Sequence, residues 1–350
     1  MRAYAVKMFC EPVAPIEQPD PQPARTEVVI DVTRCGVCHS DLHIQDGYYD
    51  LGGGKRLSLA DRGVSTPVIM GHEVLGRLVA KGPDAPIADS EIGKTFLVYP
   101  WLGCGTCDIC RRDEENYCPK SSALGVFRPG GYAEKCLVPH PKHLIDVTGI
   151  DPTLAATYAC SGITAYSALK KIEIDKDKEI LLIMGLGGVG LSGLQIAHAL
   201  GFRNIAVADI DAGKRELALA NGATDAFDPR NADAAAKLAA AGGVGGAVDF
   251  VGAKATAEFA IGALRKGGAY VVVGLFGGDT TLSIPLIVLR AITIRGSYVG
   301  NLKELKELIA LVRSGKVKPM PVETVSFNGV NEALDRLRAG KVQGRLVIAR

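Results

Sequence analysis

The pattern of hydrophobic and polar residues changes near residue 150. Before that point, short strand-like apolar runs such as EVVIDVTRCG, TFLVYP and YAEKCLVP are separated by turn sequences such as KGPDAP and RPGG. From Asp151 to Lys171 the apolar residues take helical spacing. We therefore predict a β-rich first part followed by a helix.

From Glu179 onward, strand-like and helix-like segments alternate. EILLIMG, NIAVADID, AVDFVG and AYVVVGLFG are apolar runs, and GLSGLQIAHALG, GKRELALANG and ATAEFAIGALRKG between them have helical spacing. This alternation is typical of a doubly wound parallel sheet with both faces covered by helices. After Ile294 we expect one amphipathic helix, LKELKELIALVRSG, and a closing strand, GRLVIAR. The predicted fold class is α/β.

Composition and charge narrow the classes of protein. A chain of 350 residues with 47% hydrophobic residues can form two cores, and the net charge of +2 comes without a basic block, which argues against nucleic acid and anionic membranes as partners. Ile180 to Phe202 is uncharged and long enough to cross a bilayer, but its glycines favour a buried strand, turn and helix. The N-terminal stretch lacks the apolar core of a signal peptide, so we expect a cytoplasmic protein with no membrane partner.

A glycine-rich turn follows the first strand of the alternating region. Its sequence is Gly185-Leu186-Gly187-Gly188-Val189-Gly190, the G-x-G-x-x-G pattern between a strand and a helix. The first glycine permits the tight turn, the second lets the backbone approach a pyrophosphate, and the last allows close packing of helix on sheet. We predict a dinucleotide site here; a purely structural glycine turn is the alternative.

Asp209 ends the next strand, where a carboxylate hydrogen-bonds the adenosine ribose. It would repel a 2′-phosphate, and Ile210 and Asp211 follow it where an arginine would serve NADP. The sequence favours NAD over NADP.

The chain has nine cysteines, an odd number that excludes complete internal disulfide pairing. Cys104, Cys107, Cys110 and Cys118 have the spacing C-x2-C-x2-C-x7-C, and four thiolates can close a tetrahedral shell around zinc. An iron cluster would also suit four thiolates, and four unligated cysteines are the plain alternative. We predict a structural zinc site.

A second dense segment, CGVCHSDLH at residues 35–43, contains two cysteines and two histidines. By itself it leaves a metal site, a disulfide and a polar loop open. A metal site would need ligands from elsewhere in the chain.

Several motifs together resemble the zinc-dependent medium-chain alcohol dehydrogenases. They are GVCHSDLH, Gly71-His72-Glu73 with Gly76 and Gly82, the four-cysteine segment, ACSGITAYSAL, and GLGGVG with Asp209. The segment from Gly47 to Gly63 resembles a bacterial subgroup of primary-alcohol and 6-hydroxyhexanoate dehydrogenases. The resemblance implies a GroES-like catalytic domain (residues 1–155 and 295–350) around a Rossmann NAD-binding domain (residues 156–294), and a homo-oligomer, either tetramer or dimer.

The resemblance also assigns site residues. Cys38, His72 and Cys160 become ligands of a catalytic zinc with one open position, the second zinc of each chain. Asp41 would orient His72, Glu73 would lie beside the metal, and Ser40 and His43 would relay the proton. The remaining assignments are the pyrophosphate contacts His39 and Arg345, the nicotinamide contacts Thr164, Val251, Val273 and Leu275, and a substrate-pocket wall, Trp101, for which a plain core aromatic is the alternative.

The implied reaction is reversible oxidation of a primary or secondary alcohol to an aldehyde or ketone, by hydride transfer from an alkoxide to NAD. The substrate is a small alcohol, with 6-hydroxyhexanoate or another medium-chain or aromatic alcohol as possibilities. A zinc polyol dehydrogenase and a non-catalytic nucleotide-binding protein are the alternatives. Outside both metal sets we expect Cys10, Cys35 and Cys136 to be buried, and His140 and His143 to form a surface pair.

Overall fold

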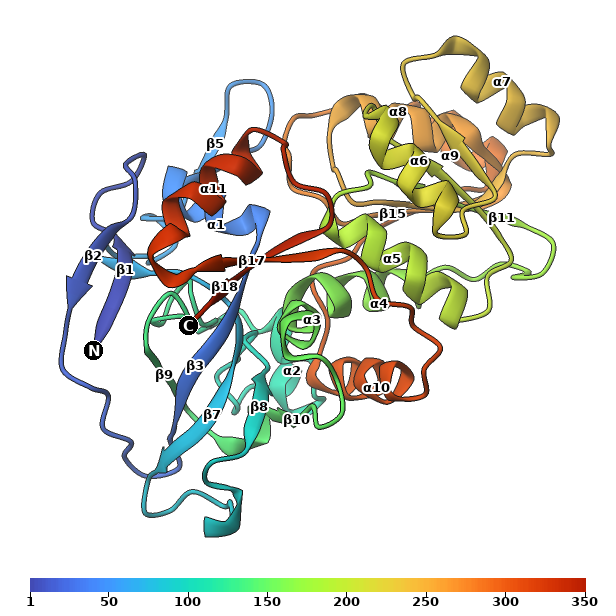
Figure 1. The fold of residues 1–350 in the computed structure, drawn as a ribbon. Helices are drawn as coiled ribbons and strands as arrows, with labels where there is room; N and C mark the ends of the chain where they lie inside the picture. Colours follow the sequence, from blue (N-terminus) through green and yellow to red (C-terminus); the bar gives the residue numbers. More distant parts are fainter.

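The computed structural model describes residues 1–350, apart from the side chain at position 232. Figure 1 shows a β-rich unit that holds both chain ends, beside a unit in which helices cover a sheet. In the β-rich unit the seven-stranded sheet has the order β10-β8-β7-β3-β18-β17, with β9 also paired to β3. Its strands are β3 (Val28–Val37), β7 (Glu73–Lys81), β8 (Thr95–Val98), β9 (Lys135–Val138), β10 (Leu144–Asp146), β17 (Val322–Ser326) and β18 (Arg345–Ala349).

A three-stranded sheet and a hairpin complete the strands of this unit. The sheet has the order β2-β1-β6, formed by β1 (Arg2–Val6), β2 (Ala14–Glu17) and β6 (Val68–Ile69). The hairpin pairs β4 (Tyr48–Asp50) with β5 (Arg56–Ser58). The helices and helical turns are α1 (His39–Asp46), η1 (Asp89–Glu91), α2 (Asp108–Arg111), η2 (Glu115–Tyr117), η3 (Pro141–His143), η5 (Phe327–Gly329) and α11 (Val330–Arg338).

The second unit is built on a parallel six-stranded sheet of order β13-β12-β11-β14-β15-β16. Its strands are β11 (Ile180–Met184), β12 (Asn204–Ala208), β13 (Asp225–Phe227), β14 (Val244–Asp249), β15 (Leu264–Val272) and β16 (Thr293–Gly296), and its helices are α5 (Gly188–Ala199), α6 (Ala212–Ala220), α7 (Ala232–Ala240), α8 (Lys254–Ala263) and α9 (Ile284–Arg290). This confirms the predicted doubly wound sheet. The helix predicted in ATAEFAIGALRKG ends at Ala263, earlier than its spacing indicated, because Leu264 already pairs with Val244 as a strand residue.

The helical segment predicted from Asp151 to Lys171 joins the two units. It consists of α3 (Pro152–Thr157), a wide π-helical turn η4 (Tyr158–Gly162) and α4 (Ile163–Leu169). The Asp151 side chain accepts a hydrogen bond from the Leu154 N–H (2.9 Å) and so caps the first turn. The amphipathic helix α10 (Leu302–Arg313), predicted from its spacing, packs against α4.

The chain returns to the β-rich unit at its C-terminal end, where β18 lies between β3 and β17 in the sheet (Figure 1). This sheet membership supports the division into residues 1–155 with 295–350 and residues 156–294, which we keep as a proposal. β16 ends just past that boundary, so its last residues belong to the parallel sheet.

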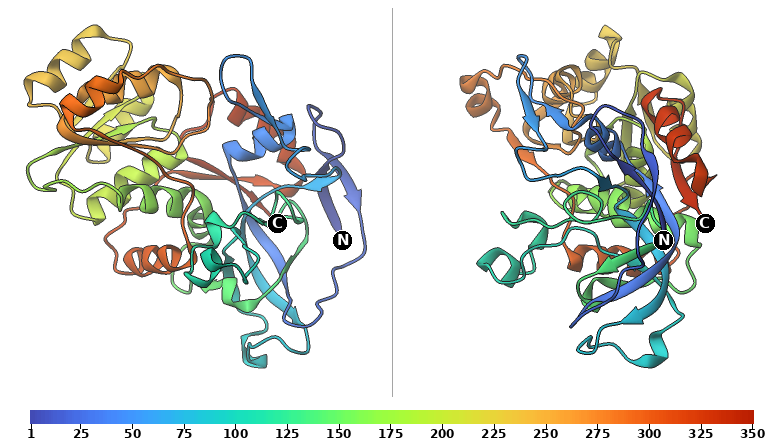
Figure 2. Two further views of the ribbon diagram at one scale, coloured as in Figure 1. Left: turned by 180° about the vertical axis from the view of Figure 1, so that it is seen from behind. Right: turned by 90° about the vertical axis from the view of Figure 1, so that its left-hand side faces the viewer.

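The apolar stretch Ile180 to Phe202 forms β11, the glycine turn and α5, so it does not span a membrane, and among the described residues no helix has the length and apolarity to do so. The β4–β5 hairpin reaches the second unit (Figure 2): a Cβ atom at Gly52 would lie 2.6 Å from the backbone nitrogen of Asp279. This hairpin therefore contacts the second unit.

Candidate active site and metal centres

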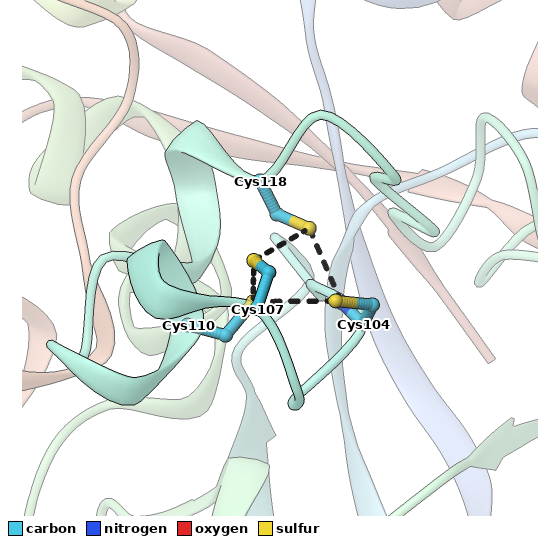
Figure 3. A group of neighbouring side chains, drawn as sticks. All are labelled: Cys104, Cys107, Cys110 and Cys118. Carbon is cyan, nitrogen blue, oxygen red and sulfur yellow. Dashed lines mark hydrogen bonds between the residues drawn. The ribbon is translucent and has the colours of Figure 1, made fainter.

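The four cysteines of the C-x2-C-x2-C-x7-C segment converge, as Figure 3 shows. The Sγ atoms of Cys107 and Cys110 are 3.5 Å apart, those of Cys107 and Cys118 3.8 Å, and those of Cys104 and Cys110 3.9 Å. A disulfide needs about 2.05 Å, whereas four thiolates at about 2.3 Å from a central zinc lie roughly 3.8 Å from one another. The donor set and its spacing therefore fit a closed zinc shell. We call residues 104–118 the cysteine lobe.

Glu115 attaches the cysteine lobe to the rest of its unit. Its carboxylate is buried, accepts a hydrogen bond from the Gly103 N–H (3.3 Å), lies 3.3 Å from Nε2 of His143 and forms an ion pair with Lys142. Burial opposes its ionisation, but the hydrogen bonds with His143 and Lys142 outweigh burial and lower the pKa of Glu115 to about 2. The expectation of a surface histidine pair is therefore wrong for His143, which is buried against this carboxylate.

Cys38, His72, Glu73 and Cys160 form the second cluster, although they come from three separate regions of the sequence. All four are buried, one ligand atom from each lies within 4.8 Å of the others, and the two Sγ atoms are 3.8 Å apart. Cys38 precedes α1, His72 precedes β7, and Cys160 lies in the π-helical turn. Such turns frequently occur at functional sites. The segment CGVCHSDLH thus contributes one ligand, Cys38, to a site built from three regions.

The imidazole of His72 is oriented toward this cluster by Asp41. Nδ1 of His72 lies 3.5 Å from Oδ1 of Asp41, while Nε2 of His72 is buried without a hydrogen-bond partner among the described residues. Oδ2 of Asp41 accepts hydrogen bonds from the Cys38 N–H and the Tyr132 hydroxyl, both at 2.9 Å. A buried nitrogen so oriented beside two thiols is what a zinc ion requires. The sequence reading missed Tyr132, which no motif signals.

Glu73 and Arg345 connect the second cluster to the glycine turn. The guanidinium of Arg345, a β18 residue, pairs with the carboxylate of Glu73, and both side chains are buried. Burial raises the pKa of Glu73 to about 7, with Arg345 opposing the rise. A Cβ atom at Gly188 would lie 2.0 Å from Cδ of Arg345, so this side chain crosses the start of α5.

The glycine turn has the geometry that its motif predicts. Gly185 has φ +83°, and a Cβ atom at Gly190 would lie 1.8 Å from the Gly185 oxygen, which leaves room only for glycine. A Cβ atom at Gly187 would meet none of the described atoms within 4 Å, so the backbone is open where a pyrophosphate would lie. Val189 lies in the first turn of α5.

Asp209 follows β12, and its carboxylate contacts the glycine turn. Its Oδ2 accepts a hydrogen bond from the Leu186 N–H (2.7 Å), and its Oδ1 accepts one from the Asp211 N–H (2.9 Å). Two arginines that the sequence reading did not consider approach the same strand end. Arg215 donates to the Asp209 backbone oxygen, Arg230 donates to the Ile210 oxygen, and both pair with Asp228.

Ser40 and His43 lie three residues apart on α1 and so share one face of that helix. The ring of His43 lies 4.8 Å from that of Tyr49 in the β4–β5 hairpin. His39 is exposed, and its ring lies 6.4 Å from that of Phe276 in the second unit. The first residue of α1 thus lies close to the second unit.

The remaining candidate positions differ in burial and in their neighbours. Thr164 is buried with no hydrogen-bond partner for its hydroxyl among the described residues, and Cγ2 of Val251 is 2.5 Å from a Cβ atom built at Gly185. Val273 is partly buried and Leu275 is exposed. The ring of Trp101 lies 5.1 Å from that of His72, so Trp101 is next to a candidate metal ligand.

Other features lie outside these sites. Cys35 and Cys136 are buried as expected, but Cys10 is exposed in a turn with φ +67°, so the expectation of a buried thiol is wrong there. A surface hollow of about 400 Å³ beside Arg2 and Phe327 is lined by none of the candidate site residues.

Comparisons with known proteins agree with this geometry. Residues 24–149 match the family model of the alcohol dehydrogenase GroES-like domain, and residues 188–314 match that of zinc-binding dehydrogenases. The chain is 35% identical to an NAD-dependent alcohol dehydrogenase of Saccharolobus solfataricus and 30% identical to a D-arabinose 1-dehydrogenase (NADP(+)) of the same organism, with 97% or more of each chain covered in both comparisons. The crystal structure of an alcohol dehydrogenase from Aeropyrum pernix, 27% identical, has a TM-score of 0.90 over the whole of both chains.

These matches cover both units and every motif on which the sequence reading rested. They confirm the predicted fold class and enzyme class, and zinc and NAD as the cofactors of the family. The chain belongs to the zinc-dependent medium-chain alcohol dehydrogenases.

Proposed function

We propose that this enzyme oxidises a primary alcohol to the aldehyde with NAD, and catalyses the reverse reaction, at the cluster of Cys38, His72 and Cys160. The observation that carries the proposal is the convergence of two thiols and an unpartnered imidazole nitrogen beside the glycine turn. The name of the Saccharolobus relative supports the alcohol and the cofactor.

Each side chain has a distinct part in the proposal. Cys38, His72 and Cys160 would hold a zinc ion, which would supply Lewis-acid activation of the alcohol, and bound NAD would supply the hydride acceptor. Asp41 orients His72, and Arg345 holds Glu73 beside the ligands while reaching the phosphate turn. Ser40 would receive the alcohol proton, which would pass through the nicotinamide ribose to His43 and then to solvent. His43 suits this role because burial, with the charges of His39 and Arg338, lowers its pKa and keeps the ring neutral, while Asp46 and Cys38 oppose that shift.

The proposal is tested by Cys160→Ala. Loss of one thiolate should lower kcat by on the order of 10³-fold or more, because metal polarisation contributes several kcal/mol to catalysis. Zinc content should fall from two to one per chain while NAD affinity, measured by calorimetry, stays near wild type. Full turnover in Cys160→Ala would contradict the proposal.

NAD is the proposed cofactor because the Asp209 carboxylate lies at the end of β12, where it would repel a 2′-phosphate. The nearby Arg215 and Arg230 are already paired with Asp228. Comparing KM for NAD and NADP tests this. Asp209→Ala should reduce the difference between the KM values for NAD and NADP. Equal KM values for the two cofactors in the wild type would contradict the preference for NAD.

The substrate is proposed to be a medium-chain, aromatic or ω-hydroxylated primary alcohol. Arg62 supports the hydroxyacid as a substrate, because its positive charge would pair with the carboxylate. The side chain of Arg62 is exposed. Burial raises the pKa of Tyr49 and of Tyr298, and the charge of Arg62 acts in the opposite direction on both. Tyr298 contacts Trp101, so this positive charge lies near the proposed substrate wall. Comparing kcat/KM for hexanol, 6-hydroxyhexanoate, benzyl alcohol and cyclohexanol distinguishes these classes of substrate. If Arg62 binds a carboxylate, Arg62→Ala should reduce kcat/KM for the hydroxyacid alone.

A polyol or sugar substrate is the second candidate, favoured by the relative named D-arabinose 1-dehydrogenase. Adding sorbitol and D-arabinose to the same panel separates the two candidates. Higher kcat/KM on these than on any simple alcohol would replace the first proposal.

We also propose that the chain forms a homo-oligomer, a dimer or tetramer, in the cytoplasm. The edge strand β16 is exposed along its length, and α9 beside it exposes 74% of Ile284, 73% of Val288 and 67% of Leu289. An unpaired strand edge beside an apolar helix suits two-fold pairing with a second copy. All nine cysteines are free thiols, which suits a reducing compartment.

A further inference from the structure

Tyr298 connects the second metal cluster with the loop that follows β16. Its ring lies edge-on to that of Trp101, with centroids 6.1 Å apart and an angle of 65°, and half of Tyr298 is exposed. Trp101 in turn lies against His72 and donates from Nε1 to the oxygen of Ala159 (3.0 Å), the residue before Cys160. The position of the Tyr298 ring therefore sets the space beside the candidate metal ligands.

The loop that carries Tyr298 is strained. Val299, the next residue, has φ +41°, in the left-handed region that a β-branched side chain rarely adopts. Such a conformation costs on the order of 1–3 kcal/mol and persists only where surrounding contacts impose it. Some contacts must therefore hold the backbone on both sides of Val299.

Two side chains from distant segments provide those contacts. Nδ2 of Asn116 donates to the backbone oxygen of Tyr298 (3.2 Å), and the hydroxyl of Tyr99 donates to the backbone oxygen of Gly300 (2.9 Å). Asn116 and Tyr99 are both buried. The strained residue is thus fixed from either side by hydrogen bonds to its neighbours.

Asn116 belongs to the cysteine lobe, between Cys110 and Cys118, and directly follows Glu115. Glu115 fixes the lobe to His143 and Lys142, while Asn116 reaches across to the loop after β16. The position of the lobe is therefore transmitted to Tyr298 through one hydrogen bond. This gives the lobe a contact with the substrate side of the enzyme as well as a metal site.

We propose that Asn116 is a positioning residue that, through the backbone oxygen of Tyr298, holds the Tyr298 ring as a wall of the substrate pocket. The cysteine lobe then tunes which alcohols fit beside Trp101. The proposal rests on the proposed function, because it assumes that the alcohol binds at Cys38, His72 and Cys160. Alcohols large enough to reach the wall should depend on Asn116, and ethanol should not.

The test replaces Asn116 with leucine, which has a similar shape but no donor. Asn331→Leu is the matched control, since Nδ2 of Asn331 also donates to a backbone oxygen, that of Val13 (2.9 Å). We expect KM for benzyl alcohol to rise about tenfold in Asn116→Leu, within the range of roughly 10–200-fold that pocket contacts provide. Its kcat, and both constants for ethanol, should stay within about twofold of wild type. Asn331→Leu should change none of them.

A second readout does not need turnover. Trp101 is the only tryptophan in the chain, so its fluorescence reports the environment beside Tyr298 directly. Asn116→Leu, with both zinc ions verified, should shift the emission of Trp101, and Asn331→Leu should not. In a Tyr298→Ala background, Asn116→Leu should have no further effect on fluorescence or KM, because the coupling passes through Tyr298.

Tyr99→Phe keeps the proposal testable should Asn116→Leu lose the metal of the lobe. It removes the hydrogen bond on the other side of Val299 and leaves the lobe untouched, so it should produce the same emission shift and the same rise in KM for benzyl alcohol. Unchanged fluorescence and an unchanged ratio of KM values in Tyr99→Phe, or in zinc-replete Asn116→Leu, would overturn the proposal. An enzyme without any alcohol turnover whose emission still shifts would instead count against the proposed function alone.

Discussion

The hydrogen bonds around Asp41 show how single side chains fix the chemistry of this site. One carboxylate oxygen faces His72, and the other receives the Cys38 N–H and the Tyr132 hydroxyl. Because both donors hold Asp41 in place, the His72 ring has one orientation available. The ligand geometry therefore depends on residues that would not touch the metal.

Asp41→Asn should weaken zinc binding at this cluster by roughly 10–100-fold, because partners that orient a ligand contribute about that much. Competition with a chelator measures the affinity, and the four-cysteine site should remain filled. Asp46→Asn is the control on the same helix, since Asp46 pairs with Arg338 and touches none of the ligands. Equal zinc affinity in Asp41→Asn and wild type would contradict the assigned role.

His43→Gln should slow alcohol oxidation on the order of 10²-fold near pH 7. The pKa of His43 lies below its ordinary value of about 6.5. The wild-type ring is therefore neutral, and can accept a proton, at pH values above about 6.5. The wild-type rate should therefore decline on the acid side of about 6.5, and the deficit of the variant should shrink at high pH as hydroxide replaces the relay. Profiles of kcat against pH measure both effects. His140→Gln, in an outer turn, should leave the profile unchanged.

At the scale of elements, the sequence predicted most of what periodicity controls. The alternating strands and helices, the helical segment that starts at Asp151 and the glycine turn all follow from local pattern, because each is decided within a few neighbouring residues. α1 was not predicted, since its residues HSDLHIQD lack an apolar stripe and its position depends on packing. The π-helical turn around Cys160 has no local signal either.

Contacts between distant segments were equally hidden. The catalytic ligands were joined only through family resemblance, and Tyr132, Glu115 and Asn116 carry no motif at all. They contact Asp41, His143 and Tyr298, which lie 28 or more residues away along the chain. Only a three-dimensional structure can place them.

Cys107→Ser should release the metal of the cysteine lobe and lower the melting temperature by several degrees or more, because a structural zinc contributes directly to folding. Metal analysis and calorimetry measure the two changes together. Cys10→Ser, which removes an exposed thiol outside both clusters, is the control. Full zinc content with unchanged melting in Cys107→Ser would refute the structural assignment.

At the scale of the whole molecule, the exposed face of α9 and β16 is the proposed contact with a second copy of the chain. Val288→Glu should shift the enzyme toward monomers, because a buried unpaired charge at the centre of an apolar interface costs several kcal/mol. Light scattering measures the mass. Leu219→Glu, on the exposed face of α6, is the control and should leave the mass unchanged. A wild type that is already monomeric would overturn the proposed oligomer.

The place of β18 in its sheet has a consequence for how the enzyme matures. This strand is made from residues 345–349, yet it lies inside the sheet between β3 and β17, and it supplies Arg345 to the pair with Glu73. During synthesis, β3 and β17 therefore cannot be joined, and Glu73 has no buried cation beside it, until residues 345–349 have been made and inserted. Deleting residues 345–349 should therefore abolish activity, measured as NAD reduction with an alcohol.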